Sequence, residues 1–120
     1  MSESVVYQAE RVVVDCKDLV ILDTGATISI FVNKNLLYDI KETNPIYIRG
    51  ITQEKIISNT KGKCAYLMDL EVYIVESLHI NIVCFADLDR IKFIERCKKG
   101  FIFDNTITFV EVEKLYICGH

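Results

Sequence analysis

One short segment of this chain combines a carboxylate, a hydroxyl and a glycine in an order that suggests chemistry. The apolar run at 19–22 predicts a buried strand, which would deliver the Asp23 carboxylate to a rigid position near the core, where desolvation disfavours its charge. Gly25 permits a backbone path closed to residues with a Cβ atom and lets another chain segment approach closely. Thr24 and Thr27 supply hydroxyls that can hold the loop. An alternative is a plain strand-to-turn corner with Asp23 as an Asx-turn residue. The segment reads Leu22-Asp23-Thr24-Gly25-Ala26-Thr27.

The other reactive side chains lack the context that catalysis or phosphate binding needs. Ser29, Ser58 and Ser77 do not lie in a Gly-x-Ser-x-Gly sequence, which argues against a serine hydrolase. Cys84 follows His79 by five positions and is expected to pack in the core rather than act as a Cys-His nucleophile. The sequence around Gly62 is not a phosphate-binding loop, because Gly-x-x-x-x-Gly-Lys-Ser/Thr is absent. The basic run Arg96-Cys97-Lys98-Lys99 is expected to be a solvated turn.

The five cysteines do not form a metal-binding or disulfide pattern. No two of them form a Cys-x-x-Cys pair, and an odd number without a secretory signal fits free thiols in a reducing compartment. The two histidines, His79 and His120, are also far apart. We therefore expect no metal and no cofactor. The cysteines are Cys16, Cys64, Cys84, Cys97 and Cys118.

Composition predicts one soluble, compact domain that covers residues 1–120. Hydrophobic residues make up 51% of the chain and charged residues 26%, which excludes a disordered or solvating segment. No apolar run approaches the roughly 18 residues that a membrane span needs, and residues 1–4 do not begin a secretory signal. The formal net charge of −3 argues against a nucleic-acid-binding surface.

The elements that must position Asp23 are mostly short strands. A helix is predicted to begin near Phe85, because Phe85, Leu88 and Ile91 recur every three residues and two aspartates lie in the first turn. The apolar runs 46–48 and 55–57 flank a Gly-containing turn and predict a hairpin. Short strands separated by turns every 8 to 12 residues or so predict a mostly-β barrel or sandwich with one short helix. Asp104-Asn105-Thr106 is predicted to be a turn between two strands, because Asx residues favour turns. Other strands are predicted at 5–7, 12–14, 19–22, 70–75, 80–83, 101–103, 107–112 and 115–118.

The segment Val20-Ile21-Leu22-Asp23-Thr24-Gly25-Ala26-Thr27 resembles the active-site loop of retroviral-type aspartic proteases, the retropepsins. Later stretches resemble the protease of Ty1/copia-type LTR retrotransposons, and the last of them looks like the start of the region that joins this protease to the integrase. The resemblance covers Val20 to Ile117, with the Asp23 loop as its one sharp motif. The later stretches are Glu71–Leu78, Asn81–Leu88 and Glu113–Ile117.

Two positions depart from the retroviral pattern. Cys84 stands where retroviral enzymes usually have Gly in the second stretch. The candidate flap, the hairpin tip that closes over substrate in this family, offers only Gly50 instead of a Gly-rich tip. The resemblance also suggests that the helix ends near Arg90 and that Ile91 to Arg96 are extended.

The fold that the resemblance implies is a closed retropepsin-like β-barrel or sandwich with one short helix, assembled as a two-fold symmetric homodimer. Peptide hydrolysis by carboxylates alone needs one group to deprotonate water and another to protonate the carbonyl oxygen or the leaving amine. Two carboxyls about 3 Å apart share one proton. Because Asp23 is the only aspartate followed by Thr-Gly, a working site requires Asp23 from two copies of the chain.

The resemblance also assigns roles to the neighbours of Asp23. Thr24 would hydrogen-bond across the two-fold axis and, with Gly25, support the loop. Ala26 and Thr27 would line the substrate cleft, and Ile82 would contribute to a side-chain pocket. The flap would close over an extended peptide bound like an added strand, and the terminal strands near 5–14 and 107–117 would build the dimer sheet. The candidate flap residues are Gly50, Ile51, Thr52 and Gln53.

Taken together, the resemblance implies an aspartic endopeptidase that cleaves its own Gag-Pol polyprotein in cytoplasmic virus-like particles. Its partners would be a second copy and an extended peptide, with no nucleic acid and no membrane. Two other interpretations remain open. The chain could be a catalytically silent domain of the same fold that binds peptides or mediates dimerisation. It could also be an unrelated small β-barrel interaction module in which Asp23 only caps a turn.

Overall fold

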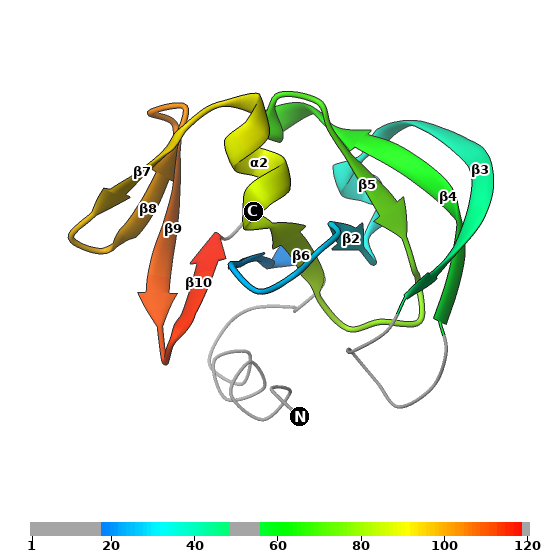
Figure 1. The fold of residues 1–120 in the computed structure, drawn as a ribbon, viewed down its shortest axis with the longest axis horizontal. Coiled ribbons are helices and arrows are strands. Elements are labelled where there is room, and N and C mark those ends of the chain that lie inside the picture. The colour runs from blue at the N-terminus through cyan, green and yellow to red at the C-terminus, as the bar shows by residue number, and fades with distance from the viewer. Residues whose placement is uncertain (1–17, 49–55, 119–120) are drawn as a thin grey trace.

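The computed structural model of the chain describes residues 18–48 and 56–118 (Figure 1). These residues form ten strands, one α-helix and two short 3₁₀ turns. In chain order they are β1 (Val20–Asp23), β2 (Ile30–Phe31), η2 (Lys34–Leu36), β3 (Tyr38–Ile48), β4 (Ile56–Cys64), η3 (Ala65–Leu67), β5 (Leu70–Ile74), β6 (Asn81–Cys84), α2 (Phe85–Ile91), β7 (Ile94–Cys97), β8 (Gly100–Phe103), β9 (Ile107–Val112) and β10 (Leu115–Cys118).

All ten strands belong to one mixed sheet, in the order β3-β4-β5-β2-β6-β1-β10-β9-β8-β7. The pairs β1–β6 and β2–β5 are parallel, and the others are antiparallel. The predicted mostly-β fold with one α-helix is thus confirmed for the described residues. The predicted closed barrel is wrong, because closure requires the two outermost strands to pair, and β3 and β7 lie at opposite ends of the strand order. Turn spacing predicts strands but does not say which of them become neighbours.

Strand β1 lies inside the sheet, between β6 and β10. Val20 and Leu22 pack into the larger core cluster, while Ile21 faces the other side of the sheet with Ile80, Leu115 and Ile117. Both faces of β1 are therefore covered, which explains why its sequence is continuously apolar rather than alternating. Asp23 follows at the carboxyl end of this buried strand.

Helix α2 begins at Phe85, as predicted, and follows β6 without a loop. Leu88 is fully buried in the larger core cluster, which also contains Phe103 and Phe109 of β8 and β9. Figure 1 shows β7, β8 and β9 on one side of α2 and β3, β4 and β5 on the other. The helix ends at Ile91 and β7 begins at Ile94, so the helix end that the resemblance suggests is correct within one residue.

The predicted hairpin is present and longer than expected. Strands β3 and β4 pair from Tyr38–Lys63 to Ile48–Ile56, with two register shifts between them. Ile48 and Ile56 pack with a second apolar cluster around Ile30 and Val75. The sequence did not indicate the first part of β3, because residues 38–45 are mostly polar or exposed and carry no period-2 pattern.

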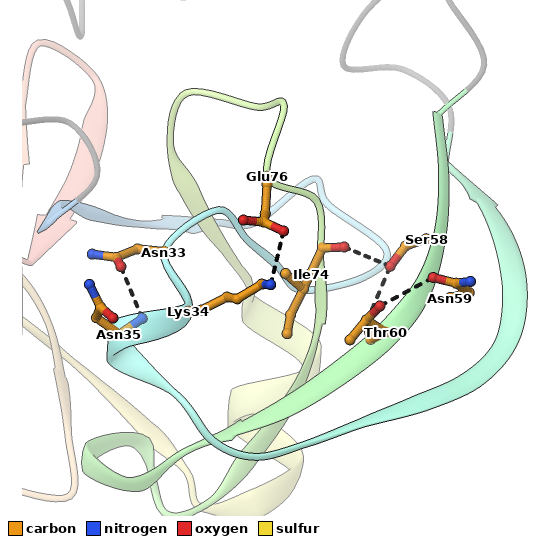
Figure 2. Close-up of polar contacts among 8 residues, drawn as sticks. All are labelled: Asn33, Lys34, Asn35, Ser58, Asn59, Thr60, Ile74 and Glu76. Atoms are coloured by element: carbon orange, nitrogen blue, oxygen red, sulfur yellow. Dashed lines mark hydrogen bonds and ion pairs between the residues drawn. The ribbon is translucent and has the colours of Figure 1, made fainter.

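Polar contacts hold this hairpin to β5 (Figure 2). The hydroxyl of Ser58, which is 2% exposed, donates to the carbonyl of Ile74 at 2.8 Å. Nearby, the Lys34 ammonium lies 3.0 Å from a Glu76 carboxylate oxygen and joins η2 to the segment after β5. Because both partners are exposed, this ion pair orients the segments more than it stabilises them.

In the C-terminal half, two positions have backbone conformations that explain which residue types occupy them. Asp104 and Asn105 have φ angles of 53° and 55°, in the left-handed region that Asp and Asn tolerate better than most residues. This confirms the predicted turn between β8 and β9. At Gly100, with φ of 155°, a Cβ atom would lie 2.0 Å from the Phe109 carbonyl oxygen. Only glycine fits at this position.

The described cysteines are not in disulfide bonds; they are Cys64, Cys84, Cys97 and Cys118. Burial raises the pKa of Cys64 to about 11 and also raises the pKa of Cys118. Burial raises the pKa of the neighbouring Tyr66 hydroxyl as well. Cys64 and Cys118 are therefore protonated at neutral pH, which suits core packing rather than nucleophilic chemistry.

Candidate active site

Asp23 is the last residue of β1 and lies in register with Cys84, the last residue of β6. The three residues before it are buried, whereas Asp23 itself is half-buried. The backbone N–H of Gly25 donates to Asp23 Oδ1 at 2.8 Å. This bond has the form of an Asx turn, and it holds the carboxyl at the point where the buried strand meets solvent.

The loop after Asp23 is open to solvent. Thr24, Gly25 and Thr27 are exposed, and Ala26 is half-buried. Gly25 does not have a positive φ. The prediction that this position needs a backbone conformation closed to other residues is therefore wrong. Among the described residues, a Cβ atom at Gly25 would meet only Asp23 Oδ1, at 3.5 Å, an ordinary contact. The described part of the chain therefore leaves room for another group to approach this position closely.

Behind the exposed loop, a buried serine ties it to α2. Ser29 is 2% exposed, and its hydroxyl donates to Asp87 Oδ2 at 3.0 Å and accepts from the Cys84 N–H at 2.9 Å. The Cys84 thiol donates to the Ala26 carbonyl at 3.1 Å. Cys84 thus contributes a weak bond to the loop.

Asp87, which accepts the hydrogen bond from Ser29, also forms an ion pair on α2. Its carboxylate lies 3.3 Å from a guanidinium nitrogen of Arg90, one turn along α2. The Arg90 side chain is largely exposed, so this ion pair adds little stability by itself. Its effect is to orient the Asp87 carboxylate toward the Ser29 hydroxyl.

The predicted pocket residue Ile82 lies on the same face of the sheet as Asp23. Ile82 is in register with Ile21 of β1 and with Ile30 of β2, and side chains two apart along a strand share a face. Ile82 is half-buried. On β9, Val110 and Val112 continue this face and are 37% and 40% exposed. The Asp23 face is therefore apolar and partly open.

The predicted flap and the predicted N-terminal strands belong to parts of the chain that the structure does not describe. The candidate flap residues Gly50, Ile51, Thr52 and Gln53, and the predicted strands near 5–14, lie outside the described residues. The strands within 107–117 are described, and β10 pairs with β1 and β9 while β9 pairs with β8 and β10. Where these strands are paired, their edges are already used within the chain, and a second copy would meet those stretches through their faces.

Three polar residues that support the loop were not recognised in the sequence as part of the site. They are Ser29, Asn81 and Asp87. Ser29 lies between Ile28 and Ile30, and Asn81 lies between Ile80 and Ile82. A buried polar residue inside an apolar run needs a hydrogen-bond partner, and this signal points to Ser29 and Asn81. Asp87 lies on helix α2 and has no such signal.

Within residues 18–48 and 56–118, no three His, Cys, Asp or Glu side chains gather so that they could hold a metal ion. No helix in the same ranges is both long and apolar enough to cross a membrane. Comparison with known proteins finds no matching protein-family model, no similar curated protein and no similar solved structure.

Proposed function

We propose that this chain is an aspartic endopeptidase of the retropepsin type, active as a homodimer with one catalytic Asp23 per subunit. Its substrate would be an extended peptide within the Gag-Pol polyprotein of a Ty1/copia-type retrotransposon, cleaved in cytoplasmic virus-like particles. The observation that carries the proposal is the Asp23 carboxyl, held by the Gly25 N–H at the end of a buried strand, beside an exposed loop.

The chemistry follows from the number of carboxyl groups. One ionised Asp23 would deprotonate a water molecule, and a protonated Asp23 from the second copy would donate to the substrate carbonyl oxygen. Asp87, a described carboxylate bound to the loop, is engaged by Ser29 and Arg90. Asp87 therefore has a supporting task, and in the proposal the second catalytic carboxyl comes from another copy of the chain.

The surroundings of Asp23 suit a peptide substrate. The face that carries Asp23 also carries half-buried Ile82 and partly exposed Val110 and Val112. Apolar side chains of a substrate or of a second copy could be buried there, and the exposed loop leaves peptide groups accessible for hydrogen bonds. In the proposal, cleft and dimer interface share this face.

The test is the dependence of peptide cleavage on protein concentration. Digestion of a proteome-derived peptide library, followed by mass spectrometry, identifies cleaved peptides whatever the sequence at the cleavage site. Because half a site does nothing, the turnover rate per subunit should fall steeply on dilution below the dimer dissociation constant, approaching proportionality to concentration. No cleavage at any concentration between about pH 3.5 and 7 would overturn the proposal. If sedimentation shows monomers and the turnover rate per subunit still stays constant on dilution, a site shared between two copies is overturned.

Gly25→Ala separates a functional role of this glycine from a structural one. We expect the free energy of unfolding to change by less than about 1 kcal/mol, because in the described part of the chain the added methyl group meets only Asp23 Oδ1, at 3.5 Å. Activity should fall at least about tenfold, because the methyl group occupies space that a substrate or second copy approaches. Thermal unfolding and peptide cleavage measure the two effects.

Gly62→Ala is the matched control. At Gly62 a Cβ atom would lie 3.1 Å from the Cβ of Leu37, so this substitution should lower the unfolding temperature. The folded fraction should keep turnover close to wild type, because Gly62 pairs with Val72 of β5, in a part of the sheet separated from β1 by β2 and β6. A fully active Gly25→Ala variant would contradict the assigned role of Gly25.

A further inference from the structure

Asn81, the first residue of β6, is the most deeply buried polar side chain among the described residues, with 0% exposure. Its Oδ1 accepts from the backbone N–H of Val32 at 2.9 Å and from that of Asn33 at 3.2 Å. Its Nδ2 donates to the carbonyl of Leu19 at 2.8 Å. One amide group thus binds main-chain groups through both of its ends.

These main-chain groups lie on either side of the candidate catalytic loop. Leu19 directly precedes β1, and Val32 and Asn33 directly follow β2. The Asn81 amide therefore joins the two ends of the segment 19–33, which contains Asp23 and its Gly25 hydrogen bond. Ser29 holds the same segment to α2 from within. Because Leu19 directly precedes β1, the Asn81 bond to its carbonyl fixes the start of the strand that ends at Asp23.

The three bonds require the chemistry of asparagine. The site demands an acceptor for two N–H groups and a donor for one carbonyl, and an ionised carboxylate offers no donor. A leucine of similar shape would leave all three main-chain groups unsatisfied in a buried place. A protonated carboxyl, however, has both an acceptor oxygen and an O–H donor, so it can reproduce these three bonds.

We propose that Asn81 is a positioning residue of the active site, whose amide sets the geometry of Asp23 by joining the two ends of segment 19–33. The inference rests on the proposed function for its catalytic consequence, while the coupling between Asn81 and the Asp23–Gly25 turn stands on geometry. A positioning residue affects the chemical step more than substrate binding. Its replacement should therefore lower kcat with little change in KM.

Asn81→Asp provides the test because its defect should depend on pH. At neutral pH the introduced carboxylate, once ionised, has no donor for the Leu19 carbonyl, and kcat should be about 10- to 100-fold below wild type with KM within about threefold. Burial favours the protonated form, so the ratio of variant to wild-type kcat should rise toward one between about pH 7 and 4. Both enzymes are compared on a peptide that the wild type cleaves.

Asn59→Asp is the control with the same change of side chain. Asn59 is exposed on β4, and its side-chain oxygen accepts from the Thr60 hydroxyl, a bond that a carboxylate retains. Its kcat should stay within about twofold of wild type over the whole pH range. All rates are measured at a temperature where thermal unfolding shows each variant to be folded, so that a loss of stability alone does not change the ratio.

Amide hydrogen exchange at Gly25 gives a readout that does not require activity. In Asn81→Asp at neutral pH, the Gly25 N–H should exchange at least about tenfold faster than in wild type, corrected for intrinsic rates, and should regain protection at acidic pH. If Asn81→Asp does not fold at neutral pH, Asn81→Ser replaces it, with the same loss of kcat and Gly25 protection but no recovery with pH.

The outcomes separate this inference from the proposed function. A wild-type chain that cleaves nothing overturns the proposed function, and Gly25 exchange then still decides whether Asn81 holds the loop. A folded Asn81→Asp variant with unchanged kcat and unchanged Gly25 protection overturns the positioning role. The positioning role is also overturned if the ratio of variant to wild-type kcat does not change with pH, because the hydrogen bonds of the Asn81 amide would then not affect the site.

Discussion

Replacing Asp23 by Asn is expected to abolish peptide cleavage, with a loss of about 10³-fold or more, and to leave the fold intact. The side chain keeps its shape, and its Oδ1 can still accept the Gly25 N–H, but an amide cannot take a proton from water. Cleavage of a selected peptide gives the rate, and circular dichroism with thermal unfolding reports the fold.

Asp39→Asn is the matched control for this substitution. Asp39 is exposed, has a φ of 52° that Asn tolerates, and forms an ion pair with Lys63 at 3.5 Å. A pair of this kind contributes little to stability, so cleavage should stay within about twofold of wild type. Turnover that survives in Asp23→Asn would show that the catalytic residue lies elsewhere.

A second large effect is expected on the dimer in the presence of pepstatin, a peptide inhibitor shaped like the tetrahedral intermediate. Because the inhibitor would bind only the two-Asp site, a concentration of about 100 times its dissociation constant should tighten dimerisation by about 100-fold, or about 2.7 kcal/mol. Sedimentation over a range of protein concentrations measures the dissociation constant with and without inhibitor.

Asp23→Asn again supplies the comparison, since its subunits should dimerise but gain much less from pepstatin. Equal tightening of wild type and Asp23→Asn would mean that the inhibitor binds away from the carboxyls. A chain that remains monomeric with and without pepstatin would favour an interaction module in which Asp23 only ends a turn. A stable dimer that ignores pepstatin and cleaves nothing would instead favour a silent domain of the same fold.

Several features of the fold were predictable because they depend on neighbouring residues. The continuous apolar run before Asp23 indicated a buried strand, and Phe85 was correctly placed as the start of the helix. Asp104 and Asn105 indicated the turn between β8 and β9. Each of these follows from side-chain periodicity or from a backbone conformation that only certain residues tolerate.

The pairing of distant strands was not predictable in this way. β1 lies between β6 and β10, which are far away in the sequence, and nothing in an apolar run states which other run will become its neighbour. The same limitation produced the error of the closed barrel. An open sheet and a closed one can have the same strands and turns, and they differ only in whether β3 meets β7.

The sequence by itself thus determined the type and position of the candidate catalytic residue: an aspartate after a buried strand, followed by a short loop with glycine. The tertiary structure decided what surrounds it. Ser29 meets Asp87, and Asn81 meets Leu19 and Val32, only because β6 and α2 pack beside the loop. The physical reason is that a local pattern records whether a side chain is buried, whereas its partner is chosen by the packing of the whole chain.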